Sequence, residues 1–313
     1  MTTVIEARGL KRNFDEVEAV RGVDLTIESG EIYGFLGPNG AGKSTVVKML
    51  TTLLAPSGGT AKIFGMDVVD AAEDIRLRIG AALQDASLDD KQSGREILEL
   101  QGALYGLTSK ETKTRIDELS TLIEMDAIDR WIGTYSGGMK RRLDLAASLM
   151  HNPDLLFLDE PTTGLDPTSR SRVWEEVRAL NQQFGTTIFL TTQYLEEADE
   201  LADRVGIISA GEIAGEGTPE ELKRSVGSDV LQVRLSSDAG EAIAALQQVD
   251  GVEKVEQGPR ALLVSVSNGA ATVSPVAVAL DAIGASVEEL TLRTPTLDDV
   301  FLELTGDRIE VSA

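Results

Sequence analysis

The sequence contains no cysteine, which excludes disulfide bonds and metal sites built from thiolates. It has no run of about 18 consecutive apolar residues, so we expect that the chain does not cross a bilayer by itself. The amino-terminal stretch MTTVIEARGLKRNF lacks the apolar segment of a signal peptide. These absences predict a soluble, cytoplasmic polypeptide.

Basic residues are scarce: 29 Lys and Arg stand against 52 Asp and Glu, which gives a formal net charge of −23. Such a charge repels the phosphate backbone of nucleic acids and the headgroups of anionic lipids. We therefore expect no nucleic-acid partner, and any membrane contact should be made through another protein. Solubility alone is the simpler explanation of the acidity.

The length of 313 residues predicts about two domains, at ~150 residues each. Short runs up to residue 35 alternate apolar and polar side chains, as in antiparallel strands. Solid apolar runs at 154–159, 186–191 and 204–209 indicate parallel strands buried on both faces. The three-to-four spacing of apolar residues predicts a helical subdomain at about 86–150. We therefore predict an α/β domain over 1–226.

Beyond Gly227 the pattern changes to a β-α-β-β-α-β order, which is typical of a small ferredoxin-like α+β domain over 227–313. The chain ends with TPTLDDVFLELTG, where Thr296 is expected to cap a helix that buries Val300, Phe301 and Leu304. We expect this domain to have a stabilising or regulatory role. The alternative is that its last helix packs only on the small sheet of the same domain.

The stretch GPNGAGKST follows an apolar strand and precedes an amphipathic helix. This is the context in which the pattern G-x-x-x-x-G-K-[ST] binds phosphate, because its glycines turn successive amides toward an anion at a helix amino terminus. Lys43 is expected to reach the β- and γ-phosphates, and Ser44 to ligate Mg²⁺. The whole stretch is predicted to bind nucleotide: Gly37, Pro38, Asn39, Gly40, Ala41, Gly42, Lys43, Ser44 and Thr45.

The run LLFLDEP supplies two acids at the end of a predicted buried strand. Asp159 can hold magnesium through water, and Glu160, one residue further on, can polarise an attacking water molecule. Capping of a following helix is the alternative role for this acidic pair.

A third motif is YSGGMKRRLDLAASLM, in which Ser136, Gly137 and Gly138 directly precede a predicted helix. The first turn of this helix carries three cations, at 140–142, which oppose the helix dipole. An anion that docks at this terminus would explain them. A solvated basic face is the alternative.

Together these motifs resemble the ATP-binding subunits of ABC transporters over roughly residues 3–225. GPNGAGKST is similar to the first phosphate motif of that family, LLFLDE to the second, and YSGGM to its signature motif, usually Leu-Ser-Gly-Gly-Gln. The resemblance implies an α/β P-loop ATPase that contains an antiparallel β subdomain and a helical subdomain. ATP and Mg²⁺ are its implied cofactors.

The resemblance also assigns single residues. Gln84 would sense magnesium and lead into the contact with a transmembrane subunit. Phe14 would stack on adenine with Val20 nearby, and ordinary core packing is the alternative for Phe14. The signature residues that would contact ATP of a partner subunit are Ser136, Gly137, Gly138 and Met139.

The resemblance implies a head-to-tail homodimer in which ATP lies between 37–45 of one subunit and 136–138 of the other. YSGGM and the PTLDDVFLEL ending are similar to the branch of daunorubicin- and doxorubicin-type resistance ATPases, which pair with separate ABC-2 membrane subunits. This implies a subunit that powers an exporter of a hydrophobic drug, antibiotic or lipid-like compound, bound to its permease at the cytoplasmic face of the cell membrane. A soluble, nucleotide-dependent regulator is the alternative.

Three residues depart from the family pattern: Tyr135 replaces Leu, Met139 replaces Gln, and Gln193 replaces His. A glutamine can donate a hydrogen bond to a γ-phosphate oxygen, but it cannot carry a proton. Because phosphoryl transfer depends mostly on placement and charge, we expect an active but slow ATPase in which Glu160 and Gln193 act together. Helix capping is the alternative for Gln193. The only histidine, His151, is expected at the surface.

Overall fold

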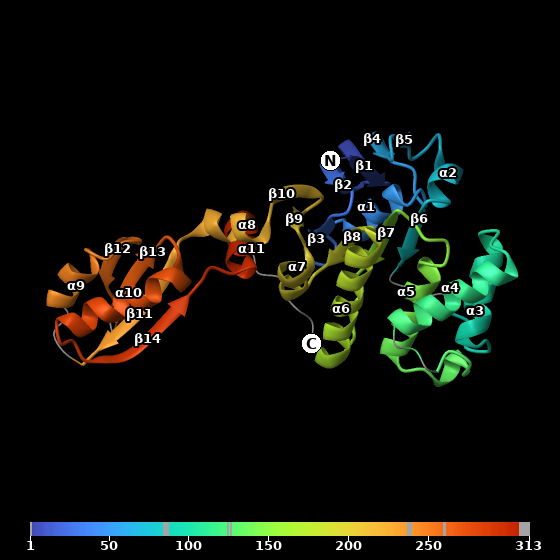
Figure 1. The fold of residues 1–313 in the computed structure, drawn as a ribbon. Helices are drawn as coiled ribbons and strands as arrows, with labels where there is room; N and C mark the ends of the chain where they lie inside the picture. Colours follow the sequence, from blue (N-terminus) through green and yellow to red (C-terminus); the bar gives the residue numbers. More distant parts are fainter. Residues whose placement is uncertain are drawn as a thin grey trace. The chain divides into compact units, whose positions relative to one another are not determined.

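The computed structural model describes residues 2–83, 88–123, 125, 127–236, 240–258 and 261–306. These residues divide into two compact units, 2–219 and 220–306 (Figure 1). The predicted domain boundary lies after residue 226, whereas the two units divide between residues 219 and 220. Helix α8 (Pro219–Val226) falls within the predicted first domain but is grouped with the second unit from Glu220 on.

The first unit is built on a six-stranded sheet whose three central strands are buried along their whole length. All neighbouring pairs are parallel except the one at the β10 edge. The strand order is β10 (Glu212–Gly217), β9 (Arg204–Ser209), β3 (Ile32–Leu36), β8 (Thr187–Thr192), β7 (Leu155–Asp159) and β6 (Ile79–Ala82). The carboxyl ends of the parallel strands therefore meet at one edge.

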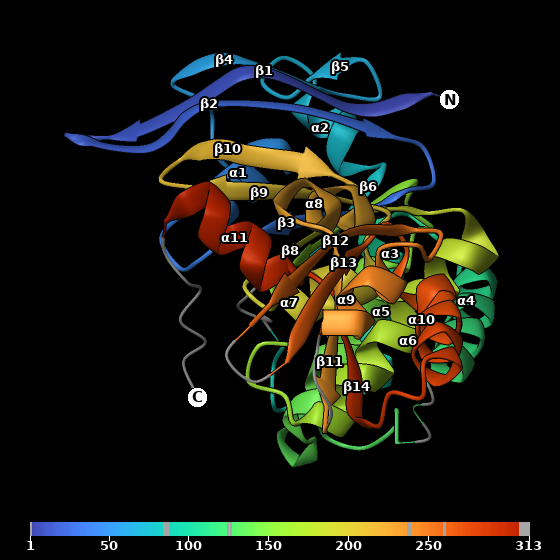
Figure 2. The same ribbon diagram turned by 90° about the vertical axis from the view of Figure 1, so that its left-hand side faces the viewer.

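A second, antiparallel sheet of four strands belongs to the same unit, as the alternating pattern near the amino terminus predicts (Figure 2). Helix α1 (Lys43–Leu50) shares one hydrophobic core with both sheets, and the short helix α2 (Ala72–Arg76) adds Ile75 to that core. The strand order is β2 (Val17–Glu28), β1 (Thr3–Phe14), β4 (Gly58–Ile63) and β5 (Met66–Asp67).

The other face of the central sheet is covered by helices that share a second core with it. Helices α3 and α4 each begin with a capping box, which satisfies amide groups of the first turn. These helices are α3 (Gly94–Leu104), α4 (Ser109–Leu122), α5 (Gly137–Ser148), α6 (Pro167–Phe184) and α7 (Leu195–Leu201), with a 3₁₀ turn, η1, at Ile132–Thr134. The range predicted as helical, about 86–150, contains α3, α4 and α5.

Phe189 lies at the centre of the sheet and contacts three aromatic rings. Its ring centroid is 5.8 Å from that of Tyr33, 5.5 Å from that of Phe35 and 5.6 Å from that of Phe157. All four side chains are fully buried. This cluster fixes the spacing of β3, β7 and β8, the strands whose carboxyl ends carry the predicted site.

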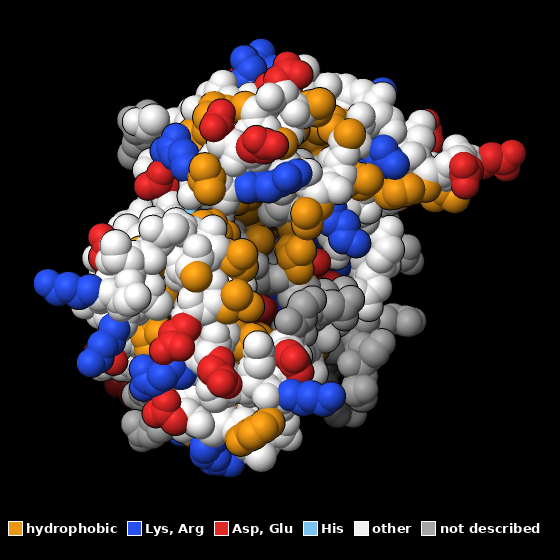
Figure 3. Space-filling model, turned by 90° about the vertical axis from the view of Figure 1, so that its right-hand side faces the viewer, with side chains coloured by type: hydrophobic (Ala, Val, Ile, Leu, Met, Phe, Trp, Pro, Cys, Tyr) orange, Lys and Arg blue, Asp and Glu red, His pale blue; other side chains and the backbone are white. Residues whose placement is uncertain are grey.

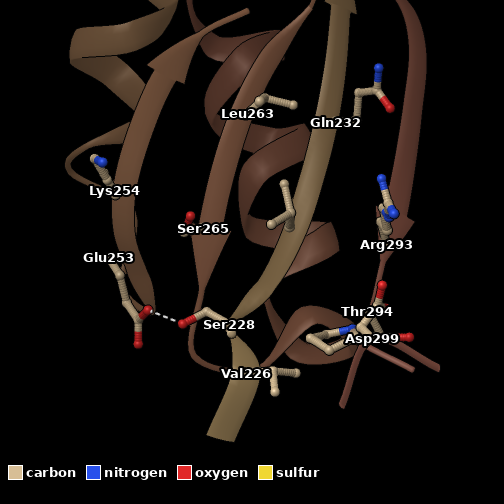
Figure 4. A pocket seen from close by; sticks show the side chains of 13 residues that line it. Val226, Ser228, Gln232, Glu253, Lys254, Leu263, Ser265, Arg293, Thr294 and Asp299 are labelled. Carbon is tan, nitrogen blue, oxygen red and sulfur yellow. Dashed lines mark hydrogen bonds between the residues drawn. The ribbon is translucent and has the colours of Figure 1, made fainter. Parts of the chain in front are cut away.

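The second unit has the predicted β-α-β-β-α-β order and an antiparallel sheet in the order β12-β13-β11-β14. One face packs on both helices, and polar side chains such as Gln232 and Arg293 lie on the other (Figure 4). The elements are β11 (Asp229–Leu235), α9 (Gly240–Leu246), β12 (Val252–Gln257), β13 (Leu262–Val266), α10 (Gly269–Ala282), β14 (Val287–Arg293) and α11 (Leu297–Thr305).

Helix α11 begins at the predicted cap, since the hydroxyl of Thr296 accepts a hydrogen bond from the amide of Asp299. Val300 and Phe301 are buried, but Leu304 is 39% exposed, so the prediction that it is buried was wrong. The helix ends one residue later, and none of its residues after Phe301 is buried. In the described part of the chain, no helix is both long and apolar enough to cross a membrane.

We predict that Phe189→Ala lowers the free energy of unfolding of the first unit by about 3–5 kcal/mol, because it leaves a cavity among three rings. The equivalent change at Phe184, which is 44% exposed, should cost about 1 kcal/mol or less. Both tryptophans, Trp131 and Trp174, lie in the first unit, so urea unfolding followed by tryptophan fluorescence reports on it. Equal losses in the two variants would contradict the central role of Phe189.

Candidate functional site

The loop between β3 and α1 is anchored on both sides. The amide of Gly37 donates to the carbonyl of Thr192 (3.1 Å), and the carbonyl of Ala41 accepts from the amide of Gly211 (3.1 Å). Gly42 has φ 107°, and a Cβ added there would lie 2.6 Å from the carbonyl oxygen of Ala19. A side chain at this position would therefore displace the loop from the antiparallel sheet.

Lys43 is buried inside the loop that precedes it. Its ammonium group donates to the carbonyls of Gly37 (2.8 Å) and Pro38 (3.1 Å) and lies 3.1 Å from a carboxylate oxygen of Glu160. The side chains of Lys43 and Glu160 are only 3% and 7% exposed. The phosphate loop and the second motif are thus joined by a buried ion pair.

Asp159, the last residue of β7, faces the first turn of α1. Its carboxylate accepts from the hydroxyl of Ser44 (3.2 Å) and from that of Thr191 on β8 (2.5 Å). Glu160 follows with φ 49°, a left-handed conformation that is uncommon outside glycine and often found at functional sites. Helix α6 is capped by Asp166 instead, so neither acid serves as the cap of the following helix.

Thr191 was not among the predicted site residues, although it supports both acids. Its hydroxyl donates to Asp159, and its hydroxyl and carbonyl oxygens accept from the amide of Glu160 at 3.0 and 3.1 Å. In the sequence this residue is one of several threonines in an apolar strand, and only the pairing of β7 with β8 brings it opposite Asp159.

Gln193 directly follows β8 at the same edge of the sheet and is 5% exposed. Its side-chain oxygen is buried and has no hydrogen-bond partner among the described residues. Helix α7 has Tyr194 at its cap position and no side-chain cap, so Gln193 does not cap this helix. A buried amide oxygen without a partner is costly, and a ligand or water molecule that reached it would supply the missing hydrogen bond.

Glu197 on α7, also missed by the sequence analysis, is fully buried. Its carboxylate accepts from the hydroxyl of Thr162 (2.8 Å) and from the indole nitrogen of Trp174 (2.9 Å). Burial raises the pKa of Glu197 above its ordinary value. Through these two hydrogen bonds Glu197 connects α7 with Trp174 of α6 and with Thr162, two residues after Glu160.

The signature motif has an exposed part and a buried part. Ser136 and Gly137 are exposed at the start of α5, and the hydroxyl of Ser136 accepts from the amide of Met139 (3.2 Å). Tyr135 is buried and donates to the carbonyl of Ala127 (2.8 Å), and Met139 packs against the helical core. Of the two positions that depart from the family pattern, Tyr135 therefore belongs to the interior and Met139 is partly buried at the start of α5.

The three cations in the first turn of α5 are all held by the protein itself. Lys140 pairs with Asp90 at 2.6 Å, and Arg142 donates to the carbonyl of Ile123 at 2.8 Å. Arg141 points inward to backbone carbonyls, among them that of Asp159 at 3.1 Å. These contacts explain the cations without a docked anion and without a solvated basic face.

The remaining predicted residues lie in different environments. Phe14 is 43% exposed, so it is not part of the core, and the guanidinium of Arg12 lies 4.6 Å from its ring centroid. Val20 is fully buried next to the position that a Cβ of Gly42 would take. Gln84 lies outside the described residues.

His151 is half-buried, so the prediction of a surface residue was wrong. Its ring stacks on that of Tyr105 with centroids 3.7 Å apart, and its Nε2 lies 3.0 Å from the carbonyl oxygen of Ile79. The end of α3 folds over this histidine, and burial lowers its pKa. Its contacts are with Ile79 and Tyr105 and not with the acids of the site.

The fold and the site define a P-loop ATPase of the ABC type. A family model described as ABC transporter matches residues 20–163, and one described as ATP-binding protein DrrA1-3-like, C-terminal domain, matches 217–305. The chain therefore belongs to the ATP-binding proteins of the ABC transporter family, and it binds and hydrolyses ATP.

Two curated relatives are each 47% identical to this chain and align with 97% of it. They are the daunorubicin resistance ATP-binding protein DrrA3 of Streptomyces coeruleorubidus, 96% of which is covered, and the daunorubicin/doxorubicin resistance ATP-binding protein DrrA of Streptomyces peucetius, 93% of which is covered. The Nod factor export ATP-binding protein I of Rhizobium sp. (strain N33) is 36% identical, with 98% of each chain covered.

Among solved structures, cbiO1 from Clostridium perfringens, part of an ABC transporter complex, matches with a TM-score of 0.66. It is 26% identical, and the match covers 71% of this chain and 91% of cbiO1. The fold of the first unit is therefore that of an ATP-binding cassette.

We predict that Thr191→Val lowers the ATPase rate about ten- to hundredfold, since loss of a hydrogen bond to a buried charge costs about 1.5–3 kcal/mol. Valine keeps the shape of threonine but removes the hydroxyl that orients Asp159. Thr187→Val, at the other end of β8, removes a hydroxyl that accepts from the amide of Gly30 and is the matched control. Steady-state rates that fall equally in both variants would indicate a general loss of stability.

Proposed function

We propose that this chain is the ATP-hydrolysing subunit that powers a membrane exporter of a hydrophobic drug, antibiotic or lipid-like compound. The observation that carries the catalytic part is the contact of Lys43 with Glu160, beside that of Ser44 with Asp159, at one edge of the sheet. The export part is supported by the relatives, whose names refer to drug resistance and Nod factor export.

The site fits a bound Mg²⁺ ion by its donor chemistry. Hydroxyl and carboxylate oxygens are the ligands that Mg²⁺ prefers, and those of Ser44 and Asp159 lie 3.2 Å apart. We assign direct ligation to Ser44, a contact through water to Asp159, and a third oxygen to Gln84. When bound, the ion neutralises negative charge on the phosphates.

The chain's own residues bind and orient the nucleotide. Amides at the start of α1, those of Lys43, Ser44 and Thr45, would donate to the phosphates. The ammonium group of Lys43 would leave the loop carbonyls and Glu160 and bind β- and γ-phosphate oxygens. This exchange releases the carboxylate of Glu160 to accept a proton from the attacking water. Phe14 is exposed at the end of β1, where its ring can stack on adenine. Val20 is buried next to Gly42 and supports the phosphate loop.

Gln193 is assigned the placement of the γ-phosphate. Its amide group can donate to a phosphate oxygen, and its buried oxygen gains a partner in the attacking water. No proton has to pass through this side chain, because Glu160 is the base. The Gln in place of the usual His is therefore compatible with hydrolysis.

We further propose a head-to-tail homodimer at the cytoplasmic face of the membrane, bound to a separate ABC-2-type permease subunit. Ser136 and Gly137 are exposed at the amino terminus of α5, a 12-residue helix whose amides and dipole favour an anion. With Gly138 and Met139 they would contact ATP held by 37–45 of the second copy. One chain carries both halves of the site, which favours two identical subunits.

We predict that Glu160→Gln lowers ATP hydrolysis at least about a hundredfold while ATP binding is retained, because the amide keeps the shape but cannot act as a base. In the presence of ATP and the permease, this variant should accumulate as a dimer in sizing and crosslinking experiments. The control is Glu175→Gln on α6. A wild-type protein no more active than Glu160→Gln would overturn the proposed enzymatic role, and protomers that stay single would overturn the dimer.

We predict that Gln193→Ala lowers kcat about tenfold with KM for ATP changed less than about threefold, because a positioning contact in the transition state is lost. Gln193→His should keep at least the wild-type rate. Gln183→Ala, on the exposed side of α6, is the control. A Gln193→Ala enzyme with the wild-type kcat would contradict the role of this amide.

A further inference from the structure

The guanidinium group of Arg141 is bound entirely inside the first unit, with its side chain only 13% exposed. Its hydrogen bonds match the five N–H groups of an arginine. Nε donates to the carbonyl of Pro161 (3.0 Å), Nη1 to that of Leu83 (3.0 Å) and to the carboxylate of Asp144 (3.2 Å), and Nη2 to the carbonyls of Asp159 (3.1 Å) and Ala82 (3.5 Å).

The four carbonyls come from the ends of two neighbouring strands. Ala82 ends β6 and pairs with Leu158 of β7, so the segments that follow these strands run side by side. Two of the carbonyls, those of Asp159 and Pro161, bracket Glu160. Leu83 directly precedes Gln84. One side chain of α5 therefore spans the backbone next to two residues with assigned roles.

Glu160 needs such support because its backbone is left-handed, at φ 49°. From one side Thr191 binds its amide, at 3.0 Å through the hydroxyl oxygen. From the other side Arg141 binds the carbonyls before and after it. These contacts set the direction in which the carboxylate leaves the chain.

We propose that Arg141 is a positioning residue of the ATPase reaction: it holds the backbone on both sides of Glu160, and before Gln84, in the geometry that hydrolysis requires. This inference rests on the proposed role of Glu160 as the base. It also connects the signature motif with the catalytic edge, because Ser136 caps the same helix. A displacement of α5 is thereby transmitted to both catalytic segments.

Asp144, one turn further along α5, holds the guanidinium from the helix side. Burial raises the pKa of Asp144 to about 6, which is still below neutral pH, and the carboxylate therefore keeps its charge opposite Arg141. Asp144 also lines a cavity of about 290 Å³, together with Arg76 of α2 and Tyr105 at the end of α3. On the side of the first unit that carries α2 and α3, hydrophobic side chains gather in a hollow (Figure 3). The contacts of Arg141 and Asp144 therefore extend from the catalytic edge to the wall of this cavity.

The test uses Arg141→Lys in the full-length chain. A lysine keeps the charge and the attraction to Asp144, but its single ammonium group cannot reach carbonyls that are spread over two strands. We expect kcat to fall at least about tenfold, with KM for ATP within about threefold of wild type. Arg142→Lys is the matched control, since Arg142 donates to the carbonyl of Ile123. It should stay within about twofold of wild type in both constants.

Hydrogen exchange gives a readout that is independent of activity. In Arg141→Lys the amides of 159–163 should exchange faster, whereas those in the middle of α5 should not change. A folded Arg141→Lys protein with wild-type kcat and wild-type exchange at 159–163 overturns the proposal. Equal changes in kcat and exchange in Arg142→Lys overturn it too, since they would show a general loosening of α5.

Asp144→Asn covers the case in which Arg141→Lys does not fold. It leaves the guanidinium in place and removes the charge that orients it. We expect a kcat about threefold lower, an unchanged KM and faster exchange at 159–163. A folded Asp144→Asn protein that matches wild type in all three overturns the proposal. Wild-type protein no more active than Glu160→Gln would instead reject the proposed base, while the exchange data still test whether Arg141 holds the backbone around Glu160.

Discussion

The buried ion pair between Lys43 and Glu160 is the interaction on which the rest of the site depends. A charge pair with 3% and 7% exposure loses much of its hydration, and such pairs add little to stability compared with apolar side chains. Its value lies in preorganisation, because it keeps the ammonium group of Lys43 and the carboxylate that we propose as the general base within 3.1 Å of each other. Every strand and helix that reaches this edge, through Thr191, Ser44 or Arg141, restrains one of the two partners or its neighbour Asp159.

The positions that depart from the ABC transporter pattern differ in their physical meaning. Tyr135 is buried in the helical core and Met139 is partly buried against it, so a change of side chain at these positions alters packing, while Ser136 and Gly137 stay exposed. Gln193 differs from these, because its oxygen is buried without a partner at the carboxyl edge of the sheet. An unpaired side-chain oxygen at this position is consistent with the proposed contact to a ligand, which needs no proton carrier.

The second unit differs from the first in the way its sheet is covered. Its sheet is covered by helices on one face only, as expected for an antiparallel sheet, and its order could be read from alternating runs and helical runs in sequence. The chain matches relatives of the drug-resistance type along both units, since residues 217–305 fit a model of their carboxyl-terminal domain. The role of the second unit in assembly or regulation stays a prediction.

The sequence by itself determined the phosphate loop, the two acids, the signature motif and the order of strands and helices along the second unit, because each is encoded within a short stretch by glycine positions, capping residues and apolar spacing. Tertiary structure decided which side chains orient those groups. Thr191 meets Asp159 only through the pairing of β7 with β8, and Arg141 reaches Leu83 across 58 positions of the chain. His151 is half-buried because α3 folds over it. Hydrogen-bond partners across strands and helices depend on packing between distant segments, and no local pattern specifies them.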